Sequence, residues 1–349
     1  MTESANASAS TASTSTHAVE PMTDKFGRTI RDLRFSLTDR CNLRCVYCMP
    51  EEGADWINRD DILTDEEIIR LIRIATSRLG ITMVRFTGGE PLLRKSLEKL
   101  IAATPVSTAI TTNGLGLVHR AQSLKDAGLD RVTVSLDSVN SEVFSSLTRR
   151  DRLDDVLAGL DAAVAARLQP VKVNSVVMPG VNDGAELKEL ANYCLAKGLE
   201  LRFIEQMPLG PPAQWNRDIM VKREDILATL ESEFELSPAE TPRGSAPAEV
   251  WRATSRKNSE LNGKIGVIAS VTQPFCGNCD RTRITADGAV RNCLFANSEM
   301  SLRDVMRAGG TDDEVIAAWR QNTWAKLPGH GIDEPGFLQP KRSMSAIGG

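Results

Sequence analysis

Six short runs of apolar residues, each followed by a polar turn and a helical pattern, fill the middle of the chain. They lie at residues 32–37, 81–86, 107–111, 131–136, 171–177 and 199–207. Strands that alternate with helices predict a parallel sheet with right-handed crossovers. Six units, where a complete barrel has eight, predict an α/β fold of the partial (β/α)6 TIM-like barrel type, although a doubly wound sheet fits the same pattern. Either fold binds its ligands at the carboxyl ends of the strands.

The helix between the first two strands has a clear beginning and end. Thr64 and Glu67 have the spacing of a capping box, apolar residues follow at helical intervals, and Gly80 ends the pattern. The first repeat therefore predicts a complete strand–helix–strand unit.

Three cysteines, Cys41, Cys45 and Cys48, directly follow the first strand in "DRCNLRCVYCMP", with the spacing C-x3-C-x2-C. A cubane iron–sulfur cluster is usually held by four thiolates, so three leave one iron free to bind a small molecule. The alternative is a zinc loop completed by a distant Cys or His. The histidines available are His17, His119 and His330.

A second set of three cysteines, Cys276, Cys279 and Cys293, has the spacing C-x2-C-x13-C. This spacing matches a zinc ribbon better than the first, but a structural zinc site needs four ligands and no fourth follows. Cys194 lies in an amphipathic helical pattern, where a buried apolar role is expected. The second set therefore predicts another cluster with an open iron, carried by a C-terminal α+β segment.

The composition of the chain limits the kinds of protein in which these cysteine sets could lie. Hydrophobic residues make up 41% of the 349 residues, and the net charge is -4, which argues against general nucleic-acid binding. No apolar run is long enough to span a membrane. The Ser/Thr/Ala-rich start lacks the features of a secretory signal, so we expect a disordered tail at 1–23 and a cytoplasmic protein with reduced thiols. The barrel is expected at 24–207 and the second cysteine region at 208–349.

Basic residues interrupt the apolar strands. Arg34, Arg85, Lys172 and Arg202 lie in four of the six predicted strands, and Arg281 and Arg283 share one face if "RTRIT" is extended. Any one of these basic residues could form a salt bridge or be exposed to solvent. Together, cations in buried strands need anionic partners, so their convergence predicts a site for a polyanion such as a triphosphate.

The first cysteine loop, with Tyr47 before its last cysteine, resembles the radical S-adenosylmethionine enzymes. In that family the open iron binds S-adenosylmethionine, and cluster reduction releases a 5'-deoxyadenosyl radical. "FTGGEP" after the second strand resembles the family segment that receives the cofactor's amino group. Gly88 and Gly89 there allow close backbone approach, although a plain turn explains them equally well in isolation. The residues implied to contact the cofactor are Tyr47, Gly89, Ser135 and Met207.

A narrower resemblance covers about residues 24–349. The segments "TGGEP", "TTNG", "VSLD", "KVN", "RFIE" and "CDRTR", with the terminal "GG", resemble the GTP 3',8-cyclases of molybdenum cofactor biosynthesis. The long N-terminal extension is the one departure. The resemblance implies that Cys276, Cys279 and Cys293 hold a second [4Fe-4S] cluster that meets the guanine. The residues implied to bind GTP are Arg34, Arg85, Thr111, Lys172, Arg281, Thr282 and Arg283; those implied to act in catalysis are Arg281, Arg283, Gly348 and Gly349.

The resemblance also implies a reaction and its partners. The adenosyl radical would abstract the hydrogen at C3' of GTP, and the new carbon radical would close on C8 of guanine, giving 3',8-cyclo-7,8-dihydro-GTP. The implied partners are GTP, a reductant protein of flavodoxin or ferredoxin type, and the cyclic pyranopterin monophosphate synthase that acts downstream, with a homodimer as the candidate assembly. Two alternatives stay open: a radical peptide maturase with an auxiliary cluster, and a non-catalytic iron–sulfur electron carrier or sensor.

Overall fold

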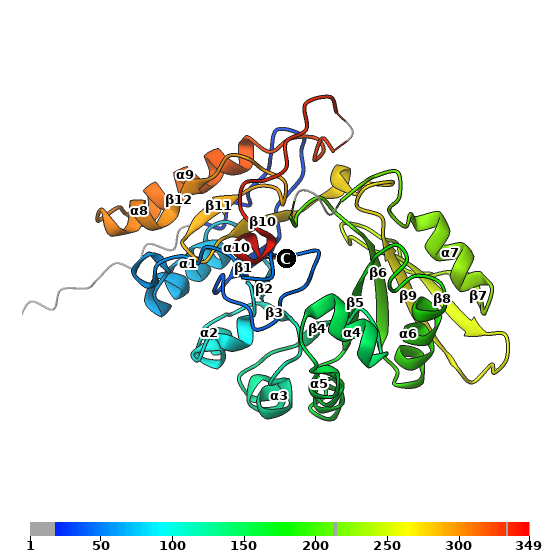
Figure 1. Cartoon of the computed structure of the whole chain (residues 1–349). Coiled ribbons are helices and arrows are strands. Elements are labelled where there is room, and N and C mark those ends of the chain that lie inside the picture. Colours follow the sequence, from blue (N-terminus) through cyan, green and yellow to red (C-terminus); the bar gives the residue numbers. More distant parts are fainter. Residues whose placement is uncertain (1–17, 212–214, 333, 349) are drawn as a thin grey trace, which may run out of the picture.

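The computed structural model describes residues 18–211, 215–332 and 334–348. In this part of the chain one 12-stranded sheet has the order β12-β11-β10-β1-β2-β3-β4-β5-β6-β9-β8-β7 (Figure 1). The strands are β1 (Asp32–Ser36), β2 (Met83–Thr87), β3 (Ser107–Thr112), β4 (Arg131–Ser135), β5 (Lys172–Val177), β6 (Glu200–Glu205), β7 (Phe234–Pro238), β8 (Glu249–Ser255), β9 (Asn262–Ile268), β10 (Arg281–Ile284), β11 (Ala289–Arg291) and β12 (Met300–Ser301).

The six predicted strands are confirmed as β1 to β6, and each pairs in parallel with the next. The sheet curves without closing, which confirms the partial barrel over the doubly wound alternative. The helices are α1 (Asp65–Ser77), α2 (Leu97–Ala102), α3 (Leu117–Asp126), α4 (Ser141–Thr148), α5 (Leu153–Ala165), α6 (Ala185–Ala196), α7 (Arg223–Glu231), α8 (Leu302–Arg307), α9 (Asp312–Trp324) and α10 (Met344–Ile347). Most of them form an outer layer around the curved sheet (Figure 1).

The predicted capping box begins α1 as expected. The Thr64 hydroxyl accepts a hydrogen bond from the Glu67 N–H at 3.2 Å, and the Glu67 carboxylate accepts one from the Thr64 N–H at 2.8 Å. Cys194 is fully buried in α6, as an apolar core residue should be. None of the described helices is long and apolar enough to cross a membrane.

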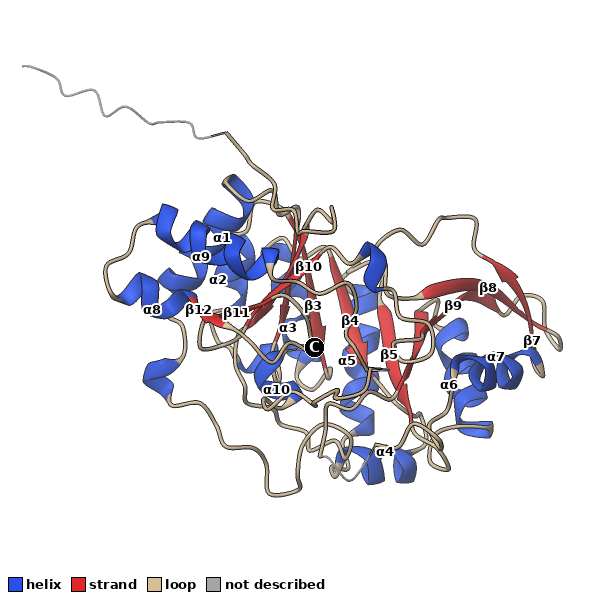
Figure 2. Ribbon diagram, turned by 90° about the horizontal axis from the view of Figure 1, so that it is seen from above, coloured by secondary structure: helices blue, strands red, loops and turns tan. Residues whose placement is uncertain are grey.

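The C-terminal region extends both edges of the barrel sheet. β9 pairs in parallel with β6 and continues into the antiparallel β8 and β7, while β10 pairs in parallel with β1 and continues into β11 and β12. Figure 2 shows these two additions at opposite ends of the molecule. An open barrel has two edge strands with unpaired backbone groups. The C-terminal strands satisfy both edges.

Part of the segment expected to be a disordered tail is packed on the body of the protein. Residues 1–17 lie outside the described part, but residues 20–23, placed in the disordered tail from sequence, pack against the body. The Glu20 and Met22 N–H groups donate to Arg78 O and Leu79 O at 3.0 and 3.2 Å. The Met22 side chain is only 1% exposed. Burial of this apolar side chain holds residues 20–23 against the body of the protein. The Ser/Thr-rich composition of the preceding residues gave no sign of this contact.

Candidate active site

A cavity of about 780 Å³ lies along the inner face of the open barrel. Both cysteine sets line it, at opposite ends of the strands. The first set follows the carboxyl end of β1, whereas Cys279 precedes the amino end of β10, which is parallel to β1. The expectation that all the chemistry lies at the carboxyl ends is therefore wrong for the second set. The other sequence-predicted residues in the lining are Arg34, Tyr47, Arg85, Gly89, Thr111, Ser135, Lys172, Met207, Arg281 and Arg283.

The "TGGE" turn packs directly on the backbone that leads into the first cysteine loop. The Gly89 N–H donates to Thr38 O at 2.7 Å, and the Glu90 N–H donates to Arg40 O at 2.8 Å. A Cβ on Gly89 would stand 2.3 Å from Arg40 O and 2.4 Å from Asp39 O. Glycine is thus required here to bring the turn and the cysteine loop together, whatever ligand binds beside them.

Glu90 and Asn113, which the sequence reasoning missed as individual residues, support Cys41. The fully buried Glu90 carboxylate accepts from the Thr112 hydroxyl and the Asn113 N–H, each at 2.7 Å, and burial raises its pKa to about 7. Asn113 Nδ2 lies 3.7 Å from Cys41 Sγ and donates to Asn42 Oδ1 at 2.7 Å. The motifs "GGEP" and "TTNG" contained both residues, but nothing in either motif showed that they meet.

Tyr47 is fixed by the carboxylate of Asp137, which follows β4. Its hydroxyl donates to Asp137 Oδ2 at 2.6 Å, and Asp137 Oδ1 accepts from the Val176 N–H at 2.8 Å. Burial raises the pKa of Asp137 to about 6. Ser135 and Met207 line the same cavity. This end of the cavity therefore combines an oriented aromatic ring with small and apolar side chains beside the cysteine loop.

Three arginines on adjacent strands form one basic wall of the cavity. Arg34 is in register with Arg85 on one side and with Arg283 on the other. Burial, followed by the charge of Arg34, lowers the pKa values of Arg85 and Arg283 to about 9. The buried Nε atoms of Arg34 and Arg85 have no hydrogen-bond partner within the described residues. A bound anion would relieve both the repulsion and the missing hydrogen bonds.

Some of the cavity cations also have carboxylate partners, as the salt-bridge alternative proposed. Lys172 Nζ lies 3.1 Å from Glu200, and Arg34 Nη2 lies 3.6 Å from Asp32. Arg85 contacts only the hydroxyls of Thr111 and Thr133, at 3.4 and 3.3 Å, among the described residues. Arg202, one of the cations expected to converge on a polyanion, also lines the cavity, as does Arg131, which the sequence reasoning did not name. The cations that line the cavity therefore outnumber the two carboxylates, Glu200 and Asp32, that pair with them.

The second cysteine set lies in a more positive environment than the first. Arg281 Nε donates to Cys279 Sγ at 3.3 Å. Although burial acts to raise the pKa of Cys279, the charges of Lys326 and Arg281 and the hydrogen bonds from Arg281 lower it to about 7. Burial instead raises the pKa of Cys48 in the first set to about 12. Fixed cations therefore stabilise the thiolate of Cys279, whereas burial raises the pKa of Cys276 in the same set.

The C-terminal tail turns back into the barrel through α10, which lies close to β1 and β10 (Figure 1). Arg283 Nη1 donates to Gly348 O at 2.8 Å. Gly349 lies outside the described residues. Thr282, predicted to contact GTP, instead accepts a hydrogen bond from Trp319 Nε1 of α9 at 3.0 Å, and its side chain is not part of the cavity lining. Neighbouring residues of a strand face opposite sides, so Thr282 turns away where Arg281 and Arg283 turn in.

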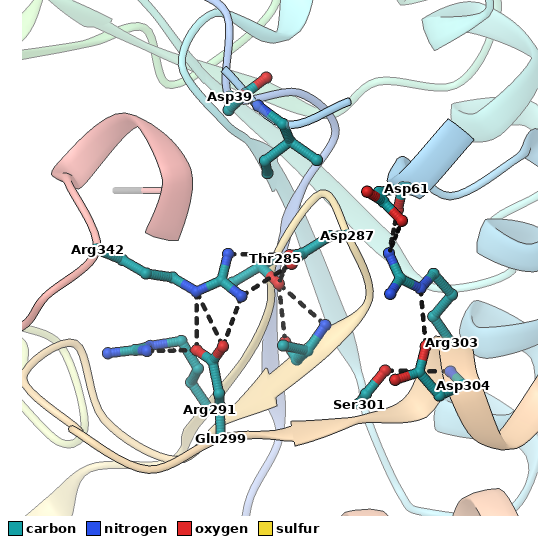
Figure 3. Close-up of polar contacts among 12 residues, drawn as sticks. Asp39, Asp61, Thr285, Asp287, Arg291, Glu299, Ser301, Arg303, Asp304 and Arg342 are labelled. Atoms are coloured by element: carbon teal, nitrogen blue, oxygen red, sulfur yellow. Dashed lines mark hydrogen bonds and ion pairs between the residues drawn. The ribbon is translucent and has the colours of Figure 1, made fainter. Parts of the chain in front are cut away.

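An arginine just before α10 anchors this tail. Arg342 lies between the carboxylates of Asp287 and Glu299, at 2.8 and 2.5 Å, and Arg291 contacts Glu299 from the other side at 2.7 Å (Figure 3). Asp287 belongs to the turn between β10 and β11, and Glu299 immediately precedes β12. The arginine thus ties the tail to the strands that flank the second cysteine set.

Replacing Arg342 with methionine is expected to lower the yield of the cyclised nucleotide that the resemblance implies about tenfold. The tail loses hydrogen bonds to charged groups, of which one contributes about 1.5 kcal/mol. Product yield and iron content measured together would separate this effect from cluster loss. Arg303→Met is the matched control, because Arg303 bridges Asp61 and Asp304 nearby without holding the tail (Figure 3). Equal losses in the two variants would contradict the anchor.

The donor sets fit iron–sulfur clusters better than single ions. Among the described residues, no three His, Cys, Asp or Glu side chains gather tightly enough to hold one metal ion. A cubane cluster spreads its thiolates over separate irons. Each set offers three thiols that line one end of the cavity, so Cys41, Cys45 and Cys48 can hold one cluster and Cys276, Cys279 and Cys293 another.

Comparisons with known proteins agree with this site. Residues 35–194 match the Radical SAM superfamily, and residues 199–332 match the family Molybdenum Cofactor Synthesis C. The peptide-bound SuiB of Streptococcus suis has a similar fold, with a TM-score of 0.57 at 13% identity over 87% of this chain and 68% of that one. The fold and the first cysteine loop thus define a radical S-adenosylmethionine enzyme.

Relatives of much higher identity narrow this class. The GTP 3',8-cyclase of Corynebacterium glutamicum is 59% identical over 94% of this chain and 89% of its own length. That of Mycolicibacterium smegmatis is 54% identical over 94% of this chain and 92% of its own. The chain belongs to the GTP 3',8-cyclase family.

Proposed function

We propose that this enzyme cyclises GTP to (8S)-3',8-cyclo-7,8-dihydroguanosine 5'-triphosphate, the first step of molybdenum cofactor biosynthesis. One observation carries the proposal: a single cavity has a three-cysteine set at each end and a basic wall between them. A radical generator at one end, a guanine site at the other and a basic wall that anchors the phosphates, so that the ribose faces the radical generator, suit one nucleotide bound in the cavity.

The residues divide the task by position. When bound at Cys41, Cys45 and Cys48, a [4Fe-4S] cluster supplies the electron that cleaves S-adenosylmethionine. Tyr47, oriented by Asp137, together with Gly89, Ser135 and Met207, would hold that cofactor beside the cluster. Asn113 orients the loop through Cys41. These contacts keep the cofactor and the substrate ribose in one fixed geometry, which reduces the entropic part of the barrier.

At the other end, the chain provides a guanine site and an anion clamp. Cys276, Cys279 and Cys293 would hold a second [4Fe-4S] cluster, which would supply a binding site for the base. The GTP contacts we propose are Arg34, Arg85, Thr111, Lys172, Arg281 and Arg283, together with Arg202, which lines the same cavity. Thr282 can contribute only through its backbone, since its side chain bonds to Trp319. Gly348 orients Arg283 through its carbonyl, and Gly349 completes the tail.

The test is anaerobic incubation of the reconstituted enzyme with GTP, S-adenosylmethionine and a reductant, followed by identification of both products. We expect one 5'-deoxyadenosine for each cyclised nucleotide. Release of 5'-deoxyadenosine without a cyclised nucleotide would favour another radical enzyme, such as a peptide maturase. Absence of 5'-deoxyadenosine would favour an electron carrier.

The partners follow from the reaction. A flavodoxin- or ferredoxin-type protein would supply the electron, and cyclic pyranopterin monophosphate synthase would consume the product. A reducing cytoplasm suits two sets of free cysteines that must stay available to iron. The peptide-maturase alternative has the likeness to SuiB in its favour, but at 13% identity that likeness shows the fold alone. The basic wall favours a nucleotide.

Neutralising Lys172 or Arg85, as Lys172→Gln or Arg85→Gln, is expected to weaken GTP binding by about 1.5–3 kcal/mol, the range for hydrogen bonds to charged groups. Binding of S-adenosylmethionine should change much less. Calorimetry with each ligand measures both. Lys264→Gln is the matched control: Lys264 contacts the same Glu200 at 3.4 Å, but its side chain is 62% exposed and lies outside the cavity lining. If either variant lost affinity for S-adenosylmethionine while GTP bound normally, the assignment of Lys172 and Arg85 to GTP would be refuted.

A further inference from the structure

Lys326 is a buried lysine with no obvious counter-ion. It follows the last turn of α9, and only 3% of the residue is exposed. Its Nζ donates to two backbone carbonyls, Arg281 O at 2.9 Å and Asn292 O at 2.5 Å. Among the residues that the structure describes, no carboxylate lies within ion-pair distance of this ammonium. Burying an unpaired charge is costly, so the fold implies an anion nearby that side-chain carboxylates do not supply.

The position of Lys326 points to the second cysteine set as that anion. Arg281 lies two residues after Cys279, and Asn292 immediately precedes Cys293, so one ammonium ties together both segments that carry these ligands. Lys326 is not part of the cavity lining, so it stands behind the cysteines and is not placed to contact a bound triphosphate.

The residues around Lys326 hold it firmly in this place. Arg28 donates to Leu327 O at 2.7 Å and Pro328 O at 3.1 Å, and its Nη1 also donates to Cys276 O at 2.7 Å. His330 donates through Nε2 to Ser270 O at 2.8 Å and accepts from the Ile332 N–H at 3.2 Å, as the neutral ring does. The segment from Lys326 to His330 therefore wraps the cysteine set from its outer side.

We propose that Lys326 is a positioning residue of the second cluster and that its buried positive charge raises the reduction potential of that cluster. The inference rests on the second cluster of the proposed function. A thiolate-bound cluster is negative and becomes more negative on reduction, so a fixed nearby cation stabilises the reduced form more. Little solvent or salt can screen the charge at this depth. Lys326 thus sets how readily the cluster accepts an electron.

The experiment removes the charge but keeps the hydrogen bonds. A glutamine amide can donate to both carbonyls, so Lys326→Gln deletes the charge, whereas Lys326→Arg retains it. Each variant is made in full-length protein carrying Cys45→Ala, so that only the second cluster is present, and is titrated electrochemically with detection by electron paramagnetic resonance. We expect Lys326→Gln to lower the reduced-to-oxidised ratio at a fixed potential at least tenfold, which corresponds to about 59 mV for one electron. Lys326→Arg should stay near the parent.

A surface lysine provides the control. Lys197 pairs with the exposed Asp161 at 2.7 Å, so Lys197→Gln removes one charge far from any ligand segment and should leave the ratio unchanged. An unchanged potential in Lys326→Gln with the cluster present, or loss of the cluster in both Lys326 variants, would overturn the inference. Loss in Lys326→Gln alone would support it, because Lys326→Arg keeps the charge. A parent protein without iron at this site would instead refute the second cluster itself.

Discussion

Cys45→Ala is expected to reduce 5'-deoxyadenosine formation to background. Cys45 belongs to the first cysteine set, and this set has three thiols, so its loss leaves two ligands where a cluster with one open iron requires three. The cyclised nucleotide should disappear with it. Quantifying 5'-deoxyadenosine and iron in the same samples tests both statements.

Cys279→Ala is the matched variant at the other end of the cavity. It should retain iron at the first site and still release some 5'-deoxyadenosine, while GTP binding and product formation fall. The two sets lie at opposite ends of the strands, and no cysteine is shared between them. If each single variant lost iron equally from both sites, the two sets could not be independent.

Gly348→Ala is expected to reduce product formation roughly 100-fold, the scale for small displacements of a positioned substrate. Gly348 has φ +81°, and a Cβ there would stand 2.5 Å from Thr87 Oγ1 and 2.9 Å from Ser36 Cβ. The tail must therefore move, and Arg283 then loses the Gly348 carbonyl it contacts. Deleting Gly348 and Gly349 should have the same effect. Both clusters should remain, as iron analysis can show.

Gly309→Ala is the control for the backbone conformation. Gly309 has φ +86°, but a Cβ there would meet nothing within 4 Å. Its substitution carries the cost of a left-handed residue without the crowding of the cavity. Similar losses of product in the two variants would show that Gly348 acts through backbone strain alone, and a deletion variant with full product yield would leave the tail without a role.

The strand pattern and the cysteine spacing predicted most of the architecture. Each expected strand formed because runs such as residues 171–177 alternate between buried side chains and side chains that line the cavity, and end at turn residues. Alternation along "RTRIT" correctly placed Arg281 and Arg283 on one face. The same alternation places the Thr282 side chain on the opposite face, where it accepts a hydrogen bond from Trp319. The resemblance grouped Thr282 with its two arginine neighbours and gave no sign of this difference.

Other parts of the site depend on contacts between distant segments, which local patterns do not reveal. Asp137 orients Tyr47 across the cavity, and Glu90 supports Asn113 from the neighbouring strand. Lys326 lies in "WAKLPGH", where nothing in the sequence marks it as buried. The opposite placement of the two cysteine sets required knowing that β10 pairs with β1, although the paired residues Asp32 and Arg281 are far apart in the sequence.

That pairing also orders events during synthesis. β1 is among the first strands to leave the ribosome, yet its neighbour β10 is among the last, so one side of β1 has no partner until the chain is nearly complete. Contacts between such distant segments slow folding and leave strand edges open to wrong pairing meanwhile. The first cysteine loop emerges during this interval, well before the segments that form the second. Iron–sulfur clusters supplied after release, once β10 has paired with β1, would meet both sets of thiols in their final geometry.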